Sequence, residues 1–316
     1  RSFPDHSRTP ELTFLMAEAL HDADVLPRAI LAYEQVAYEF IDERYGANAG
    51  YAALLALDKL IDEALVKSRS NANQSDLLPL NSLHKQRIES AIRFADYYPA
   101  DQRAIAVLTN AAERLYTQGN KELAIEIATR LTHWNPQPDL ALQKTAWLVL
   151  SHSLYELDRF AEAETSYRAV LQLLANDDKD KLAVSDRIAA SIYKQAEQNV
   201  VNNQRLEAVE RLLSIAVIAP NSVINMNAQY DAANHLIALK DWQTAERVLI
   251  HFQQKYPESE LQKTIAPKLA VIYQETEQWS KAAAQLNVMS NSEDAPQARR
   301  NALYLSAQLY QKSDSH

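Results

Sequence analysis

One stretch of this chain repeats itself at a fixed interval, and the repetition restricts the fold more than any other feature of the sequence. Ala233, Ala270 and Ala307 are 37 residues apart, and each is followed three residues later by a large apolar residue. A period of about 20 to 50 residues is the signature of stacked units that cover one another's apolar faces. The sequence therefore predicts a solenoid.

Each repeat contains two stretches in which apolar residues have helical spacing. Leu269, Ala270 and Tyr273 illustrate the first stretch, and Ala245 and Leu249 the second. Alanine lets two helices approach closely, whereas a longer side chain at the contact would cost about 1–3 kcal/mol through overpacking. Each repeat is therefore expected to be a helical hairpin, and the whole chain to be all-α.

This pattern resembles the tetratricopeptide repeat. The best match consists of Trp147, Leu150, Ser151, Leu154, Ala163, Tyr167 and Val170. The alanines that begin the matching part of the second helices are Ala124, Ala163, Ala208, Ala245 and Ala282, at spacings of 39, 45, 37 and 37 residues. The resemblance implies a right-handed α-solenoid of about seven hairpins plus a partial one.

Residues 1–316 are expected to form a single array that is a fragment of a longer protein. Phe3-Pro4-Asp5 looks like a repeat end, because it compares with Tyr256-Pro257-Glu258. At the other end, Leu303, Ala307 and Tyr310 resemble a first helix that has no second helix after it. The second unit is irregular, because a polar insert at 67–82 separates its helices, and we expect this insert to be an exposed loop.

Composition argues against several classes of function. The net charge of -9 disfavours binding to nucleic-acid phosphates. No apolar run reaches the roughly 18 residues of a membrane span, so direct insertion into a membrane is not expected. The chain has no cysteine, which excludes disulfides and cysteine-bound zinc.

The residue patterns do not indicate a catalytic, cofactor-binding or metal-binding site. The three glycines, Gly46, Gly50 and Gly119, form no phosphate-binding loop. The eight histidines are scattered and form no pair with zinc-ligand spacing. We therefore expect a protein that is not an enzyme and that needs no cofactor.

A partner-binding groove is what the resemblance to tetratricopeptide proteins implies instead. In that family the first helices line a concave surface, and the matching positions on one helix here are Thr109, Glu113 and Tyr116. The residues expected to contact a partner are Tyr116, His152, Tyr155, Tyr193, Glu197, Tyr230, Asn234 and Tyr304. Tyrosine suits a binding groove because it combines a large contact area with a hydroxyl group, but it also packs well between adjacent hairpins.

Two functions remain open at this point. The first is a protein–protein interaction scaffold that binds a peptide or partner protein, with self-association through the apolar faces of the end repeats. The second is an accessory region that serves a catalytic or transport domain outside these residues, in polysaccharide export or peptidoglycan work. The repeat ends and the lack of cysteine resemble tetratricopeptide proteins of the bacterial periplasm and outer membrane, so we expect an envelope location, with the cytoplasm as the alternative.

Overall fold

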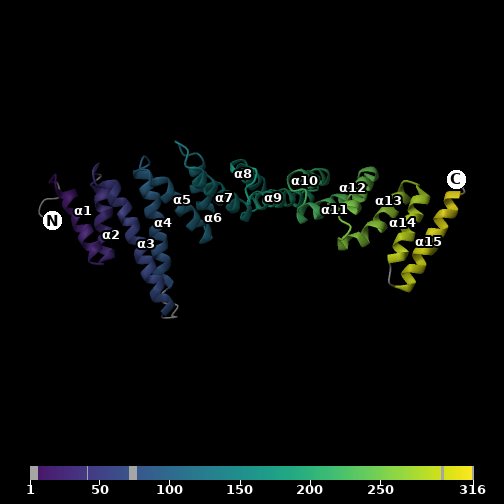
Figure 1. Ribbon diagram of the computed structural model, residues 1–316, viewed down its shortest axis with the longest axis horizontal. Helices are drawn as coiled ribbons and strands as arrows, with labels where there is room; N and C mark the ends of the chain where they lie inside the picture. The colour runs from purple at the N-terminus through teal and green to yellow at the C-terminus, as the bar shows by residue number, and fades with distance from the viewer. Residues whose placement is uncertain (1–5, 41, 71–76, 293–294, 315–316) are drawn as a thin grey trace. The chain divides into compact units, whose positions relative to one another are not determined.

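The computed structural model describes residues 6–40, 42–70, 77–292 and 295–314, and all regular secondary structure in these ranges is helical (Figure 1). The α-helices are α1 (Thr9–Asp22), α2 (Leu26–Glu34), α3 (Gly46–Ser70), α4 (Leu77–Tyr97), α5 (Ala104–Thr117), α6 (Lys121–Thr132), α7 (Leu140–Glu156), α8 (Phe160–Leu173), α9 (Lys181–Val201), α10 (Arg205–Ile218), α11 (Val223–Ala238), α12 (Trp242–Lys255), α13 (Ile265–Glu275), α14 (Trp279–Ser292) and α15 (Pro296–Asp314). The predicted all-α class is confirmed.

The chain divides into two compact units, Arg1–Asp158 with α1 to α7 and Arg159–His316 with α8 to α15. Within each unit, consecutive helices pack against one another as antiparallel hairpins do. First helices of neighbouring hairpins also touch, α5 with α7 in the first unit and α9 with α11 in the second. Each unit is therefore a stack of tetratricopeptide-like hairpins, as predicted. The single array over residues 1–316 and its right-handed sense stay predictions.

The alanines predicted to lie at helix contacts are buried. Ala112 and Ala233 are completely inaccessible to solvent, and Ala270 is 2% exposed. Ala307, at the equivalent position of α15, is exposed, because no described helix covers that side of α15. The 37-residue period therefore correctly predicts buried alanines wherever another helix follows.

In most hairpins, the second residue after the end of the first helix has left-handed backbone geometry. Glycine occupies this place only at Gly119, with φ of 84°. The other residues of this kind are Asp24, Asp158, Asn203, Lys240 and Glu277, with φ between 57° and 61°. At most of these turns the next residue donates its N–H to a carbonyl five residues back, as from Asp241 to Leu236 at 3.0 Å, which is the main bond of a Schellman cap.

The structure corrects the prediction of an exposed loop at 67–82. Helix α3 continues to Ser70 and α4 already begins at Leu77, so only 71–76 of this insert lie outside the described residues. The helices extend this far because neither glycine nor proline interrupts residues 67–70. Pro79 lies in the first turn of α4, where its missing N–H breaks no helical hydrogen bond.

The second helix of the first hairpin is not α-helical throughout. Helix α2 ends at Glu34, and a π-helical turn follows over Gln35–Glu39. This turn packs closely against α3 and the end of α4, where the Tyr98 hydroxyl donates a hydrogen bond to the Ala37 carbonyl. At Gly50 a Cβ atom would lie 3.0 Å from Phe94 and 3.1 Å from the Tyr38 hydroxyl, so a larger residue would crowd these side chains.

We expect Ala270→Trp to destabilise the second unit, because Ala270 is buried where α13 meets its neighbours. Overpacking at such a site costs about 1–3 kcal/mol or more. The matched control is Ala284→Trp on α14, where the alanine is exposed and the larger side chain meets solvent. Urea unfolding followed by circular dichroism measures both. Equal losses of stability in the two variants would contradict the helix register.

Candidate partner-binding face

The second unit has a cavity on the face formed by its first helices, between α9 and α11. Its volume is about 230 Å³. It is lined by Tyr193, Ala196, Glu197, Val200, Leu212, Asp231 and His235. Tyr193 and Glu197 are two of the predicted site residues. The predicted site residues in this cavity therefore come from α9. The residues that α11 contributes, Asp231 and His235, were not predicted.

Tyr193 joins the two walls of the cavity, because its hydroxyl donates a hydrogen bond to the carboxylate of Asp231. Burial raises the pKa of Tyr193, and the neighbouring Asp231 raises it further, so the phenol stays protonated and keeps donating. Glu197 forms an ion pair of 2.7 Å with Lys194 at the exposed rim. The cavity thus combines an aromatic wall with two carboxylates.

His235 completes the wall formed by α11. Burial lowers its pKa, with a smaller contribution in the same direction from Arg205, while Asp231 acts in the opposite direction. A lowered pKa keeps the imidazole neutral near pH 7, so it can both donate and accept hydrogen bonds. The cavity therefore offers neutral polar groups as well as charged ones to a ligand.

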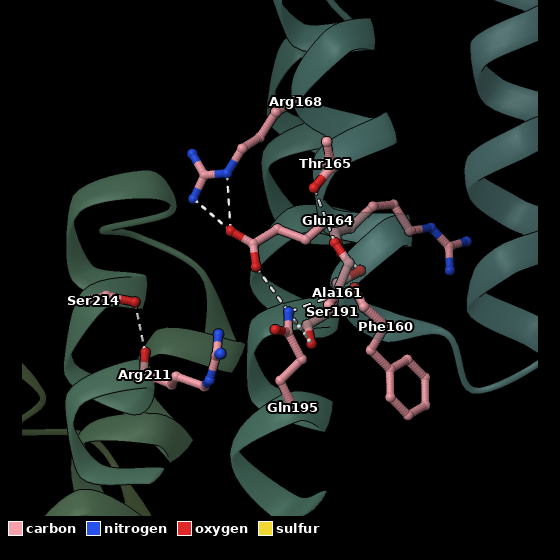
Figure 2. A network of polar contacts seen from close by, with 10 residues as sticks. Phe160, Ala161, Glu164, Thr165, Arg168, Ser191, Gln195, Arg211 and Ser214 are labelled. Carbon is pink, nitrogen blue, oxygen red and sulfur yellow. Dashed lines mark hydrogen bonds and ion pairs between the residues drawn. The ribbon is translucent and has the colours of Figure 1, made fainter. Parts of the chain in front are cut away.

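A buried polar network on the opposite side of α9 fixes how this helix is rotated (Figure 2). The side-chain amide of Gln195, which is 4% exposed, donates to the Glu164 carboxylate of α8 at 2.7 Å. Arg168 holds the other oxygen of that carboxylate at 2.8 Å. Because Gln195 points toward α8, Tyr193 and Glu197 are directed toward the cavity. The buried hydrogen bond between Gln195 and Glu164 therefore determines the orientation of α9 in addition to stabilising the packing.

In the first unit, the structure brings Tyr116 and His152 together. Their rings lie 5.9 Å apart between centroids. The Tyr116 hydroxyl donates to Glu156 at 2.5 Å, and the ammonium group of Lys121 lies 3.8 Å from the Tyr116 ring centre and 2.7 Å from Glu156. The hydrogen bond from Lys121, followed by that from Tyr116, lowers the pKa of Glu156. Tyr116 therefore links α5 to α7 by polar contacts.

The remaining predicted residues are not gathered in one site. Tyr230 is half-buried, with its hydroxyl 2.9 Å from that of Thr264 and the ammonium of Lys268 5.1 Å from its ring centre. Tyr155 and Asn234 are half-buried on α7 and α11, and Tyr304 is exposed on α15. Tyr116, Tyr193 and Tyr230 all bond to the following repeat, so the packing role left open for tyrosine applies to these three.

A second hollow lies in the first unit, between α3 and α5, and none of the predicted site residues lines it. It has a volume of about 540 Å³ and includes Tyr51, Asp58, Arg87, Arg103, Asn110 and Arg114. The predicted groove position Thr109 is wrong, because its side chain is buried and its hydroxyl donates to the Ile105 carbonyl at 2.8 Å. The helical spacing of Arg103, Asn110 and Arg114 is the signal that could have identified this face.

No protein-family model matches the chain, and no curated protein matches it. Similar solved structures include YrrB, a TPR protein with an unusual peptide-binding site, at 14% identity and a TM-score of 0.35 over 67% of this chain and 98% of YrrB. A tetratricopeptide repeat protein from Parabacteroides merdae is 15% identical, with a TM-score of 0.31 over 81% of this chain and 92% of that one. The TPR2AB domain in the pHSP90 complex of yeast Sti1 is 13% identical, with a TM-score of 0.31 over 79% and 99%.

The likeness to these proteins is one of helical architecture. Within the described part of the chain, no three histidine, aspartate or glutamate side chains are placed to share a metal ion. None of the helices in the described ranges has the length and hydropathy needed to cross a bilayer. The candidate sites are the two hollows on the first-helix faces, because predicted site residues line one and three arginines line the other.

We expect Tyr193→Phe to lower stability by about 1–2 kcal/mol, because it removes a hydrogen bond to a carboxylate while it keeps the aromatic ring. Tyr304→Phe is the matched control, since Tyr304 is 68% exposed, and its loss should stay below about 0.5 kcal/mol. Guanidinium unfolding curves measure both variants. If Tyr193→Phe is as stable as the control, the bond between α9 and α11 contributes nothing.

Proposed function

We propose that this chain is a non-catalytic interaction scaffold that binds a peptide or a partner protein on the face formed by its first helices. The observation that supports this most directly is the cavity between α9 and α11, where an aromatic wall, two carboxylates and a neutral histidine surround an open space. Ligand sites typically combine apolar walls with a few polar groups that fix orientation.

The shape and chemistry of the second unit favour a protein ligand over a small molecule. A space of about 230 Å³ is smaller than the roughly 300–1,000 Å³ of drug-sized ligand sites. It is large enough for one side chain of a bound segment, whose remaining residues would lie along α9 and α11. We therefore propose an extended segment or a helix that places one side chain between Tyr193 and His235.

We also propose a bacterial envelope location, for which the absence of cysteine and the form of the repeat ends provide support. An oxidising compartment disfavours unpaired thiols, and the chain has none to protect. If the array serves a catalytic or transport domain instead, the same face would bind that domain rather than a separate protein.

Site-specific photocrosslinking tests the proposed face. The photoreactive residue p-benzoylphenylalanine replaces either Val200, which lines the cavity on α9, or Val217, which is 83% exposed on α10. We expect illumination in envelope and cytoplasmic extracts to couple a protein to the Val200 position but not to the Val217 position. Mass spectrometry identifies the partner, and a binding constant measured with that purified protein completes the test.

Three outcomes would contradict the proposal. Crosslinks from Val217 alone would move binding to the second helices. If neither the Val200 variant nor the Val217 variant is crosslinked to a protein, a scaffold role for the second unit is contradicted. A partner found only in the cytoplasmic extract would contradict the envelope location but leave the binding face intact.

Self-association is proposed because α1 and α15 expose apolar residues on one side. Leu12, Leu15 and Met16 of α1 are 55%, 54% and 48% exposed, and Leu303 and Tyr310 of α15 are more than two-fifths exposed. Apolar stripes of this kind commonly mark contact surfaces. The array is therefore expected to associate through these helices.

Light scattering after size-exclusion chromatography measures the association. We expect the protein to form dimers or larger species at tens of micromolar, and Leu12→Glu combined with Leu15→Glu to reduce their amount at least tenfold. Leu182→Glu with Leu206→Glu changes two leucines of α9 and α10 that are at least as exposed, and it should have no effect. A monomeric wild-type chain would show that the end faces do not associate.

A further inference from the structure

The hollow between α3 and α5 is positively charged, although the whole chain is acidic. Three arginines, Arg87, Arg103 and Arg114, face it, while Asp58 is the only carboxylate among its lining residues. Asp101 neutralises Arg103 from just outside the lining. The three arginines and two aspartates therefore leave one excess positive charge in the hollow, although the protein as a whole has a net charge of -9.

Two arginines share a single carboxylate in this hollow. Arg87 contacts one oxygen of Asp58 at 3.0 Å, and Arg114 contacts the other at 2.8 Å. The side chain of Arg87 is only 7% exposed, and its Nε and Nη1 atoms have no hydrogen-bond partner among the described residues. A buried guanidinium that is only partly paired favours an additional negative charge nearby.

Arg103 is held rigidly at the other side of the hollow. Two of its nitrogens contact Asp101 at 2.8 Å and 2.6 Å, and a further bond of 3.1 Å reaches Asn48 of α3. Its guanidinium carbon lies 4.6 Å from the ring centre of Tyr51. Because these contacts fix the side chain in advance, a ligand that binds Arg103 loses little affinity to side-chain ordering.

The pKa of a neighbouring histidine, His84, is consistent with an excess of positive charge in the hollow. The pKa of His84 on α4 is lowered by burial first and by Arg114 second, while Asp58 raises it. Its Nδ1 atom is buried and has no partner among the described residues. Adding a proton at His84 is therefore unfavourable beside Arg114.

The rest of the hollow is apolar. Leu54 is buried at its base, Leu55 is 50% exposed at its rim, and Ala106 and Val107 form the wall on α5. Arg103 and Arg114 are three helical turns apart, which corresponds to about 16 Å along the axis. An extended peptide covers that distance with about five residues.

We propose that this hollow binds an extended acidic segment of a partner protein, with an aspartate or glutamate side chain at Arg114 and an adjacent apolar side chain on Leu55. The proposal rests on the proposed scaffold function and names the chemistry of the partner for the first unit. A single carboxylate cancels the excess charge, whereas a phosphate group with a charge of about −1.5 to −2 would exceed it.

Selection from a peptide array tests the proposal before any partner protein is identified. The probes are random seven-residue peptides with blocked ends, a second set with a free C-terminal carboxylate, and a third with phosphoserine. We expect wild-type protein to enrich aspartate or glutamate beside an apolar residue in the blocked set. Binding of the selected peptides should weaken at least tenfold between 50 and 500 mM salt, since salt screens exposed charges.

Charge-removing variants assign the binding to this hollow. Arg103→Gln and Arg114→Gln should each weaken the selected peptides at least tenfold, while Arg28→Gln, which changes an exposed arginine of α2, should have no effect. Thermal melts show whether each variant is folded. Arg114→Lys provides a second test if Arg114→Gln unfolds, because it keeps the charge but loses the planar guanidinium.

Several results would overturn the proposal. These are the absence of acidic enrichment, preference for the free C-terminal or phosphoserine set, and acidic peptides that bind the two glutamine variants as well as wild type. A crosslinked partner at Val200 together with any of these results would leave the scaffold function standing and remove only this inference. Failure of both experiments would contradict the scaffold function itself.

Discussion

The fold depends on the close contact that alanine permits between helices of neighbouring hairpins. A single hairpin cannot cover its own apolar face, so every unit requires the next one. Ala112 and Ala233 are fully buried, and Tyr167 and Phe252 are among the largest fully buried side chains. Stability in such a stack is a sum of local interfaces, because each helix contacts mainly its neighbours. Changes at one end therefore leave the other end largely unaffected.

The turns show how the packing of the stack overrides local preference. Left-handed backbone geometry is easy for glycine and asparagine, but Lys240 and Glu277 adopt it with φ of 61° and 57°. Their unfavourable geometry is tolerated because the Schellman bonds and the packed helices on both sides determine the turn. Because other residues adopt this geometry at the turns, the chain of 316 residues needs only three glycines. Two of them, Gly46 and Gly50, lie at close packing contacts rather than in turns.

Periodicity predicts the hairpins well. It does not determine which of two neighbouring positions on a helix faces the groove. A shift of one residue turns a side chain by about 100° around the helix axis. The apolar pattern of α5 and α11 fixes which side is buried, but it leaves the polar positions beside the core ambiguous. The positions implied by the tetratricopeptide resemblance are Thr109, where Asn110 and Arg114 line the hollow, and Tyr230 and Asn234, where Asp231 and His235 line the cavity. At the π-helical turn Gln35–Glu39, the Ala37 carbonyl accepts a hydrogen bond from Tyr98, a tertiary contact that no local pattern contains.

The three tyrosines that bond to the next repeat connect recognition to the stability of the stack. Tyr193 closes the contact between α9 and α11 and also forms a wall of the cavity, so a ligand that competed for Asp231 would weaken the contact that shapes its own site. A ligand that leaves this hydrogen bond intact preserves the contact that shapes the cavity. The arginine hollow has a different design, because its internal ion pairs already hold the side chains and a ligand completes the charge balance. Under the two proposals, the first unit selects its partner by charge, and the second by the shape of a single side chain.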